Sequence, residues 1–544
     1  MADASRRGTE PAPAATAAVD AAIQLFAQLL PLQDISQTTK VVSQLLSSVG
    51  STKLDKNTGR KAAALVNITF AVVLMLRQGT SNSARQVLGN SQVTTSLSGF
   101  LKEVLVDGDA ALRKASSEAI GRLASVAGTN FLTSQVKTLV DQVVSNRDPY
   151  GRAGCALAFG AIHAHVGGLA AGPLLKTTVH VLMSLINDPH PVVHFWALSA
   201  LARVIDAASL AYAPFVSSTL GLLFKVYMME SHEPDGGSLN HVNISGDLPA
   251  YQVVCQNIDA VITVLGPDIQ ESTRTRTLVL DLVHEFIDEE DDGICVEAIK
   301  CIQHFLMFAP DHVNVPDLVL QFRGYLSSSR RPLKLASINA LYQLVQRDAL
   351  SMSKLGGDQL VEELFAMLDD DSSVDGVRNV IASWLQQTVI YNPSAWIDLC
   401  QRIMSRTTAS QQAADAATAD DEGQSLSVGN SSTTGRPTSR WRTQLFALRC
   451  LHNICTVVGR SGRREHLDMV FARSQGIPVH GLLVSRVPDL IKIAFTAAAA
   501  HVTEIRLEGL TVLTDVIEVH FSVFRRGLRL IHSFSPDLCE SAGS

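Results

Sequence analysis

The sequence predicts an all-α solenoid, in which antiparallel helix pairs stack into a superhelix. Three observations predict it: a helix that is apolar on two faces, a recurrence of its pattern about every 40 residues, and the composition. Hydrophobic residues make up 46% of the 544 residues, whereas aromatic residues make up only 6%. This balance fits the close packing of helices rich in alanine and leucine better than it fits β-structure.

The clearest helix lies in residues 187–205, which read NDPHPVVHFWALSALARVI. From Val193 to Ile205, apolar residues recur at the three- and four-residue steps that place them on one face of a helix. Further apolar residues lie off this stripe: Phe195, Leu198 and Ala202. Pro191 suits the first turn, where a missing N–H costs little. We therefore expect a helix that is covered on two sides.

The same pattern returns along the chain. Its copies start at Leu112, Gly151 and Val193, at spacings of 39 and 42 residues. Weaker copies begin at Ile294, Leu333, Val377 and Ile505. A period of about 40 residues with two helices in each unit is typical of HEAT and armadillo repeats. One such unit cannot bury its own apolar face, so its neighbours must stack against it.

The array has interruptions that composition reveals. Residues 1–16 contain mostly Ala, Pro, Ser and charged residues, and a second segment is dominated by Ser, Thr, Ala, Gln, Gly and Asp. We therefore divide the chain into a disordered N-terminus (1–16), a HEAT-repeat array (17–404), a disordered low-complexity linker (405–439), a continuation of the array (440–519) and an atypical tail (520–544).

Periodicity and turn residues predict the individual helices. In the first half they lie at residues 17–30, 36–49, 60–77, 92–106, 109–126, 131–145, 150–166, 173–186, 191–205, 213–229 and 250–265. In the second half they lie at residues 277–287, 293–308, 316–327, 332–346, 358–368, 374–390, 394–404, 441–458, 487–500 and 503–519. The polar, glycine-rich stretch between the helices at 213–229 and 250–265 is expected to be non-helical.

Two segments have two interpretations each. The 405–439 linker is either a plain flexible insertion or a phosphorylation or docking segment, because its Ser/Thr density accompanies Asp420, Asp421 and Glu422. In the tail, apolar residues alternate with arginines over residues 521–531. This stretch forms either an amphipathic cap on an otherwise uncovered last helix or a weak membrane-binding helix.

Charge and cysteine content restrict the class of protein. The net charge is −7 and the isoelectric point about 6.1, so no basic field exists for nucleic acid. Cys155, Cys255 and Cys301 lie in apolar helical patterns and no CxxC pair occurs, which indicates a reducing cytosol. The apolar stretch at residues 62–76 is shorter than the roughly 18 residues needed to span a bilayer, so we expect a buried repeat helix.

A search for chemistry finds no catalytic, cofactor-binding or metal-ligating set. No GxSxG, Walker A or GxGxxG motif is present. His190 and His194 are four residues apart, as in a zinc helix, but His190 precedes a proline and no glutamate completes HExxH. His163 and His165 are two residues apart and point to different faces of a helix, which favours packed or inter-helix histidines. We predict that the chain is not an enzyme.

Charged clusters outside the helices are candidate contacts for a partner. The acidic turn at Asp288–Asp292 lacks the alternating ligands of an EF-hand loop, so we interpret it as solvated. Two small basic clusters are candidate contacts with phosphate or an acidic partner: Arg460, Arg463 and Arg464, and Arg330 and Arg331. They are too few to form a nucleic-acid surface.

Several longer stretches carry a resemblance. The best are GRAGCALAFGAIHAHVGGLAAGPLLKTTVHVLMSLINDP, VVCQNIDAVITVLGPDIQ, HFLMFAPDHVNVPDLV and HLDMVFARSQGIPVHGLLVSRVPDLIKIAFTAAAAH. Their most specific features are the Gly167-Gly168 corner after a histidine-bearing helix and the Leu265-Gly266-Pro267 stop. Over residues 21–519 the chain resembles the HEAT repeat-containing protein 5 family, the large adaptor-accessory proteins of animals and fungi. It corresponds to a middle portion of a longer family member.

The resemblance implies a non-enzymatic scaffold that associates with the clathrin adaptor complex of the trans-Golgi network and endosomes. It also implies roles in endocytosis, endosome-to-Golgi transport and protein localisation. The expected location is cytoplasmic, and peripheral at Golgi and endosomes through partners. No partner-binding residue can be carried over. The alternative is a HEAT-repeat scaffold of nuclear transport or translation regulation, although Trp196, Trp384 and Trp441 do not recur at one repeat position as an importin-type ladder requires.

Overall fold

The computed structural model describes residues 14–49, 58–231, 250–289, 291–355, 357–369, 374–421 and 441–533. Within these ranges it contains α-helices and short 3₁₀ helices, and no strand. The predicted all-α solenoid is therefore confirmed. The chain divides into two compact units, Met1–Val313 (unit 1) and Asn314–Ser544 (unit 2).

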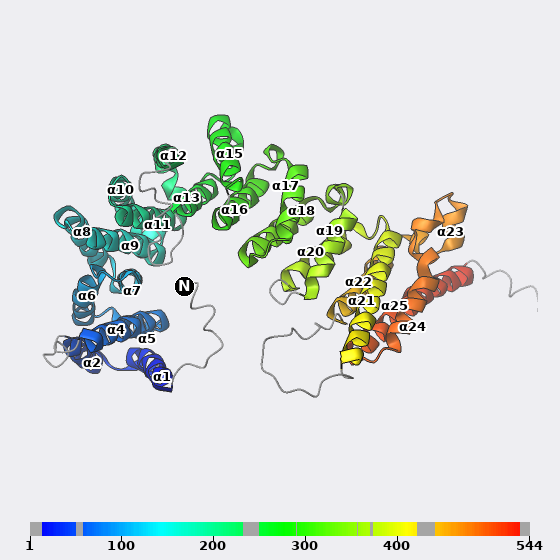
Figure 1. Cartoon of the computed structure of the whole chain (residues 1–544), viewed down its shortest axis with the longest axis horizontal. Coiled ribbons are helices and arrows are strands. Elements are labelled where there is room, and N and C mark those ends of the chain that lie inside the picture. Colours follow the sequence, from blue (N-terminus) through cyan, green and yellow to red (C-terminus); the bar gives the residue numbers. More distant parts are fainter. Residues whose placement is uncertain are drawn as a thin grey trace, which may run out of the picture. The chain divides into compact units, whose positions relative to one another are not determined.

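Unit 1 consists of stacked helix pairs (Figure 1). Its first helices are α1 (Ala14–Leu29), α2 (Ile35–Val49), α4 (Thr58–Gln78) and the short α5 (Asn82–Leu88). Five pairs follow: α6 (Ser91–Leu105) with α7 (Ala110–Ala127), α8 (Thr129–Ser145) with α9 (Pro149–Val166), α10 (Gly168–Ile186) with α11 (Pro191–Ala208), α12 (Val216–Ser231) with α13 (Ala250–Leu265), and α15 (Thr273–Ile287) with α16 (Asp292–Phe308). The 3₁₀ segment η2 (Ser209–Phe215) precedes α12, and the short α14 (Asp268–Glu271) precedes α15.

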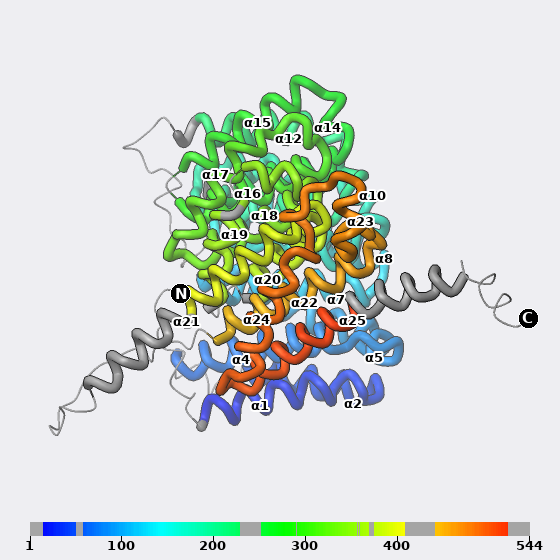
Figure 2. The backbone as a smooth tube through the Cα atoms, turned by 90° about the vertical axis from the view of Figure 1, so that its right-hand side faces the viewer, coloured from blue at the N-terminus to red at the C-terminus, as the bar shows by residue number. Residues whose placement is uncertain are grey.

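The helices of unit 1 form two layers. The second helix of each pair packs on the second helix of the next, so that α4, α7, α9, α11, α13 and α16 form one continuous row. The first helices α8, α10, α12 and α15 lie on the outer side of this row (Figure 1). At the start of unit 1, α1 and α2 lie beside α4, which Figure 2 shows from another side. We call the row of second helices the inner layer.

Three inner helices begin at an aspartate that caps them: α7, α9 and α16. The Asp109 carboxylate accepts hydrogen bonds from the backbone N–H groups of Ala111 and Leu112 at 2.7 and 3.0 Å. Asp148 caps α9 through the N–H of Gly151, and Asp291 caps α16 in the same way. These bonds satisfy N–H groups that would otherwise lack a partner at a helix start. The caps therefore fix where these three repeats turn from the outer into the inner helix.

Two arginines, of which Arg113 is buried, secure the turns. Arg113, directly after the first apolar residue of its repeat, donates to the carbonyls of Asp107 and Gly108 at 2.8 Å each. Arg152 holds the equivalent position in the next repeat and lies 2.9 Å from the Asp188 carboxylate. Each arginine thus ties the inner helix to a turn of the array, and the hydrogen bonds of Arg113 stabilise its buried charge.

Small residues allow the inner helices to approach closely. A side chain at Gly160 of α9 would meet the Cα of Ala200 on α11 at 3.0 Å. One at Gly154 would collide with the backbone carbonyl of Leu105. Gly128 and Gly167 adopt φ angles of 86° and 85°, which lets α7 join α8, and α9 join α10, through a single residue. The glycines are therefore required by the packing and by the corners.

Helix α11 confirms the prediction of two covered faces. It packs against α9, α10 and α13. The stripe residues Val193 and Trp196 are buried, and so are the off-stripe residues Phe195, Leu198 and Ala202. Cys155, Cys255 and Cys301 are also fully buried, as expected for small core residues.

Unit 2 repeats the plan. Its helices are α17 (Val315–Leu326), α18 (Arg331–Lys354), α19 (Gly357–Ala366), α20 (Val374–Thr388), α21 (Pro393–Asp421), α22 (Trp441–Arg460), α23 (Met469–Ser474), α24 (Val487–Ala498) and α25 (Thr503–Ser533), with short 3₁₀ segments that include η6 (Arg464–His466). The helices α18, α20, α22 and α25 pack on one another in order, and α17, α19, α21 and α24 pair with them.

Several helix ends differ from the predictions. Helix α21 continues through Asp421, beyond the end predicted at residue 404, and residues 422–440 lie outside the described residues. Helix α18 continues past a kink at Asp348, whose φ and ψ are −152° and 78°. Helix α25 runs to Ser533, so part of the predicted tail is helical, and residues 1–13 and 534–544 lie outside the described residues. A polar composition therefore did not correctly predict where α21 and α25 end.

Four stretches are long and apolar enough to cross a membrane by length and composition alone: residues 15–32, 58–78, 168–186 and 191–228. One of them includes α4, which is longer than the stretch predicted at residues 62–76. In unit 1, α4 packs on α1 and α7, and α10 packs on α9 and α11. Packing between repeats buries part of each apolar stretch, from 17% of residues 15–32 to 39% of residues 168–186.

Candidate partner-binding surface

A cluster of charged side chains crosses three inner helices of unit 1. Glu118 of α7 lies at its centre. Arg122, one turn further along α7, donates to its carboxylate at 2.9 and 3.0 Å. His165 of α9 and Arg203 of α11 lie 2.6 and 3.2 Å from the same carboxylate. One acidic side chain therefore connects three repeats.

The partners of Glu118 stabilise its charged form. The hydrogen bond with His165, the charges of His165 and Arg203, and the hydrogen bond from Arg122 together lower its pKa to about 2, against an opposing effect of burial. About a quarter of the Glu118 side chain remains exposed, and Arg203 is 36% exposed. The cluster is thus rigidly paired and still accessible to a partner.

A second cluster lies on the next inner helices. His304 of α16 lies 2.6 Å from the carboxylate of Asp259 on α13. This hydrogen bond raises the pKa of His304, and the negative charges of Asp259 and Asp206 add to the effect. Burial raises the pKa of Asp206 on α11, and the neighbouring Asp259 raises it further. The cluster is acidic and holds one histidine.

A third cluster extends the polar surface along the same two helices. The buried Glu297 of α16 accepts hydrogen bonds from Lys300 at 3.0 Å and from Gln256 of α13 at 3.2 Å. We call the three clusters together the polar ribbon; its charged members are Glu118, Arg122, His165, Arg203, Asp206, Asp259, Glu297, Lys300 and His304. It crosses five inner helices and offers donors, acceptors and both signs of charge. Such a surface suits many dispersed contacts with a protein.

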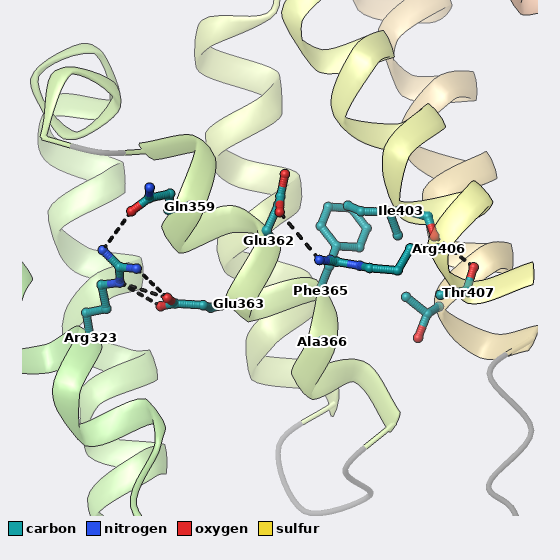
Figure 3. Close-up of a pocket in the computed structure, with 10 residues that line it drawn as sticks. Arg323, Gln359, Glu362, Glu363, Phe365, Ala366, Ile403, Arg406 and Thr407 are labelled. Carbon is teal, nitrogen blue, oxygen red and sulfur yellow. Dashed lines mark hydrogen bonds and ion pairs between the residues drawn. The ribbon is translucent and has the colours of Figure 1, made fainter. Parts of the chain in front are cut away.

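Unit 2 contains a separate groove between its first helices (Figure 3). The groove has a volume of about 450 Å³. On one side, the guanidinium of Arg323 on α17 donates hydrogen bonds to the Glu363 carboxylate of α19, and its Nε lies 2.8 Å from Oε2. The same guanidinium also donates to the side-chain oxygen of Gln359 at 3.2 Å. On the other side Glu362 faces Arg406 of α21 at 3.6 Å, as the dashed lines show.

The charged side chains of this groove are paired with one another. Arg402 adds a second contact to Glu362, with its Nη2 3.1 Å from the carboxylate. Phe365 and Ile403 add buried apolar side chains between the charged rims. The arrangement joins α17, α19 and α21, and exposed pairs of this kind contribute little to stability. The groove is therefore a second polar surface on which a partner could make contacts.

The histidine pairs noted in the sequence have structural partners. His190 caps α11 by accepting the N–H of Val192 at 3.3 Å, and the His194 ring contacts the carbonyl of Ile186. His163 is buried and lies 3.0 Å from the Thr178 hydroxyl, and burial lowers its pKa to about 4. In the described part of the chain, no three His, Cys, Asp or Glu side chains are placed to hold a metal.

The acidic turn at residues 288–292 and the two basic clusters named in the sequence analysis make different contacts in the structure. Asp291 serves as the cap of α16. Arg464 lies 3.0 Å from the Asp468 carboxylate, whereas the Arg463 guanidinium lies 5.5 Å from the centre of the Tyr391 ring. Arg330 precedes α18, and its side chain has partners in the structure. Both basic clusters belong to unit 2, whereas the polar ribbon belongs to unit 1.

The sequence did not reveal the polar ribbon. Glu118 and His165 are 47 positions apart, and Glu118 and Arg203 are 85 positions apart. The repeat alignment could have found the ribbon, because polar residues near the end of one inner helix must lie beside those of the next. Single charged residues on an otherwise apolar helix were the available signal.

Comparisons with known proteins agree with this architecture. A family model for the Laa1/Sip1/HEATR5 HEAT repeat region matches residues 482–524. Protein SWEETIE of Arabidopsis thaliana is 25% identical over 508 residues, which cover 89% of this chain and 22% of that protein. AP-1 accessory protein LAA1 of Saccharomyces cerevisiae is 22% identical over 332 residues, which cover 58% of this chain and 16% of that protein. The chain thus spans about a fifth of the length of the curated relatives that it matches.

Solved structures show the same fold. A crystal structure of a mutant of the karyopherin Kap121p is similar with a TM-score of 0.51 and 13% sequence identity, and the likeness covers 93% of this chain and 48% of that one. At this identity the likeness concerns the solenoid fold alone. The family match and the curated relatives extend beyond it, and they agree with the resemblance seen in the sequence. Residues 482–524 thus match the HEAT-repeat region of the Laa1/Sip1/HEATR5 family, and over longer stretches the chain is similar to SWEETIE and LAA1.

Proposed function

We propose that this chain is a non-enzymatic scaffold in clathrin-adaptor-dependent traffic between the trans-Golgi network and endosomes. The observation that carries the proposal is the likeness to yeast LAA1, whose name describes an accessory protein of the adaptor AP-1. We further propose that the chain acts in the cytoplasm and reaches Golgi and endosomal membranes through its partners. The likeness to SWEETIE, which covers more of the chain, carries no statement about an adaptor.

The polar ribbon is the surface that we assign to the adaptor. It lies on five consecutive inner helices, and several of its members are partly exposed. Most of its charges are already paired, so a partner must match their pattern and not merely their net sign. Contacts spread over several repeats would make most single substitutions weak, with a few strong positions near the centre.

The alternative function, as a carrier in nuclear transport, has less support. The karyopherin likeness concerns fold only. Trp196 and Trp384 are 3% and 1% exposed, so neither indole is available as part of an aromatic ladder for a cargo peptide. Trp441 lies at the start of α22 and is only partly exposed. These tryptophans serve packing.

The proposal is tested by capturing clathrin-adaptor subunits from cytosol on the purified chain. The informative variant combines Glu118→Arg with Arg203→Glu, which reverses two charges that face each other; because Arg122 and His165 also contact Glu118, circular dichroism must show that this variant remains folded. The matched control is Glu103→Arg, which changes one exposed residue of α6 outside the ribbon.

We expect the double variant to lose adaptor capture by about ten-fold or more, because charges at the centre of an interface act as hot spots. The control should capture as much as the unaltered chain. Equal capture by the double variant would exclude the ribbon as the contact. Capture of no adaptor by the unaltered chain would contradict the proposed function itself.

A further inference from the structure

A small aromatic pocket lies in unit 2, apart from the polar ribbon and the groove. It has a volume of about 250 Å³ and is lined by residues of α18, α19, α20 and α21 and of the loop before α21. Trp384 and Trp396 form buried walls, and Tyr391 and Leu350 stand at the rim, where they are 60% and 42% exposed. We call this site the aromatic pocket.

The polar atoms of its walls are already bonded. The Trp384 indole N–H donates to the Ser353 hydroxyl at 2.8 Å, and that of Trp396 donates to the Thr388 hydroxyl at 2.9 Å. Thr388 in turn donates to the backbone carbonyl of Trp384 at 2.7 Å. Because these donors are occupied, the indole rings offer the pocket mainly their apolar surface. The pocket therefore selects an apolar group.

The size of the pocket restricts its occupant. Small-molecule and cofactor sites usually enclose about 300–1,000 Å³, and this volume lies below that range. It suits one or two side chains of a peptide. Tyr391 and Leu350 are large apolar residues that remain exposed at the rim, so an entering side chain would bury additional apolar surface there.

A cationic side chain lies at the opening of the aromatic pocket. The Arg463 guanidinium lies over the Tyr391 ring, 5.5 Å from its centre. Within the described part of the chain, no carboxylate forms an ion pair with Arg463, whereas the neighbouring Arg464 is paired with Asp468. Arg460 is exposed at the end of α22, three residues before Arg463. A cation held on an aromatic ring keeps its donors available for a carboxylate.

We propose that the aromatic pocket binds a short acidic segment of a partner protein, with one bulky apolar side chain in the pocket and a neighbouring carboxylate on Arg463. The sequence singled out Arg463 as a contact for an acidic partner, and the structure adds the apolar pocket beside it. The pocket belongs to unit 2 and the polar ribbon to unit 1, so the pocket offers the scaffold a second partner. It also accounts for an aromatic side chain that is left exposed next to a cation.

The test measures binding of a fluorescein-labelled peptide, Ser-Asp-Asp-Phe-Asp-Asp-Ser, to the full chain by fluorescence anisotropy. Two matched peptides accompany it: one carries serine in place of phenylalanine, and the other carries asparagine in place of each aspartate. Three variants of the chain are compared. Arg463→Glu reverses the charge at the mouth, Ala395→Trp fills the pocket from its lining, and Arg506→Glu is a control for charge on α25, outside the pocket.

We expect the Phe-containing acidic peptide to bind at least ten-fold more tightly than either matched peptide. Arg463→Glu should weaken binding by about ten-fold or more, because a charge-assisted hydrogen bond is replaced by repulsion. Ala395→Trp should reduce binding to the level of the serine peptide, and Arg506→Glu should change it less than about two-fold, since surface charges far from a contact act weakly. If Ala395→Trp lowers the helical content, Tyr391→Ser replaces it, because that side chain is mostly exposed.

Three outcomes would overturn the proposal. The first is equal affinity for the phenylalanine and serine peptides. The second is an affinity that Arg463→Glu leaves unchanged. The third is a self-association of the chain that Ala395→Trp abolishes while the peptide fails to compete, which would assign the pocket to a second copy of the chain.

Discussion

Glu118 links three repeats of unit 1, so its replacement should measure how strongly the polar ribbon stabilises the fold. The substitution is Glu118→Gln, which keeps the shape of the side chain and removes its charge. A carboxyl whose pKa falls from 4.5 to about 2 stabilises the folded state by at most about 3 kcal/mol. The side chain is 28% exposed, and solvent screens its partners, so we expect a loss of about 1–2 kcal/mol at pH 7.

The pH dependence has a definite sign. Because the folded pKa of Glu118 lies below its ordinary value, its stabilising effect is complete above about pH 4.5 and disappears as the pH falls toward about 2. The difference between the unaltered chain and Glu118→Gln should therefore shrink as the pH falls from 4.5. Urea unfolding followed by circular dichroism at several pH values measures this difference.

The matched control is Glu103→Gln, since Glu103 is exposed on α6 and outside the ribbon. It should change the free energy of unfolding by no more than about 0.5 kcal/mol at any pH. A destabilisation by Glu118→Gln that stays constant from pH 7 to pH 3 would show that the charge of Glu118 is not what connects the helices. A loss as small as that of the control would refute the account of the cluster.

Three further predictions concern single positions. Trp196→Ala should cost about 3–5 kcal/mol in urea unfolding, because this side chain is 3% exposed, whereas Leu169→Ala, at a 98% exposed position, should cost less than about 0.5 kcal/mol. Gly154→Ala should lower the melting temperature through its clash with a backbone carbonyl, whereas Gly99→Ala, with open space around it, should raise stability by about 0.5–1 kcal/mol. His304→Gln should destabilise the chain below about pH 6.5, and the difference should vanish at pH values above the raised pKa of His304.

Each of these has a result that would count against it. Similar losses from the substitutions at Trp196 and Leu169 would mean that the inner layer does not depend on the α11 core. A stable Gly154→Ala protein would show that the helices separate easily at this point. A loss at His304 that grows with pH would reverse the assigned role of its pair with Asp259.

The sequence predicted the repeats well because their signals are local. Apolar periodicity defined α11, and the aspartates at 109 and 148 preceded inner helices that they cap. The ends of α21 and α25 were predicted too early, since low apolar content and a change of pattern do not by themselves end a helix. The repeat signal was reliable, and the helix ends were not.

The candidate sites could be predicted only in part. Arg463 was identified as a possible contact, but its position over Tyr391, 72 residues earlier in the chain, depends on how α21 and α22 pack. The pairing of Glu118 with His165 and Arg203 likewise requires the inner helices to be in register. The sequence shows which residues are charged, and only the stacking shows which of them meet.

We propose above all that this chain supports the location of a clathrin adaptor. The most direct measurement is the distribution of the adaptor in cells that lack the protein, compared with cells in which it is restored. The account predicts that the adaptor leaves endosomal and Golgi membranes without the protein and returns when it is restored. An adaptor that stays in place, together with nuclear-import cargo that accumulates in the cytoplasm, would contradict the account and favour a transport carrier.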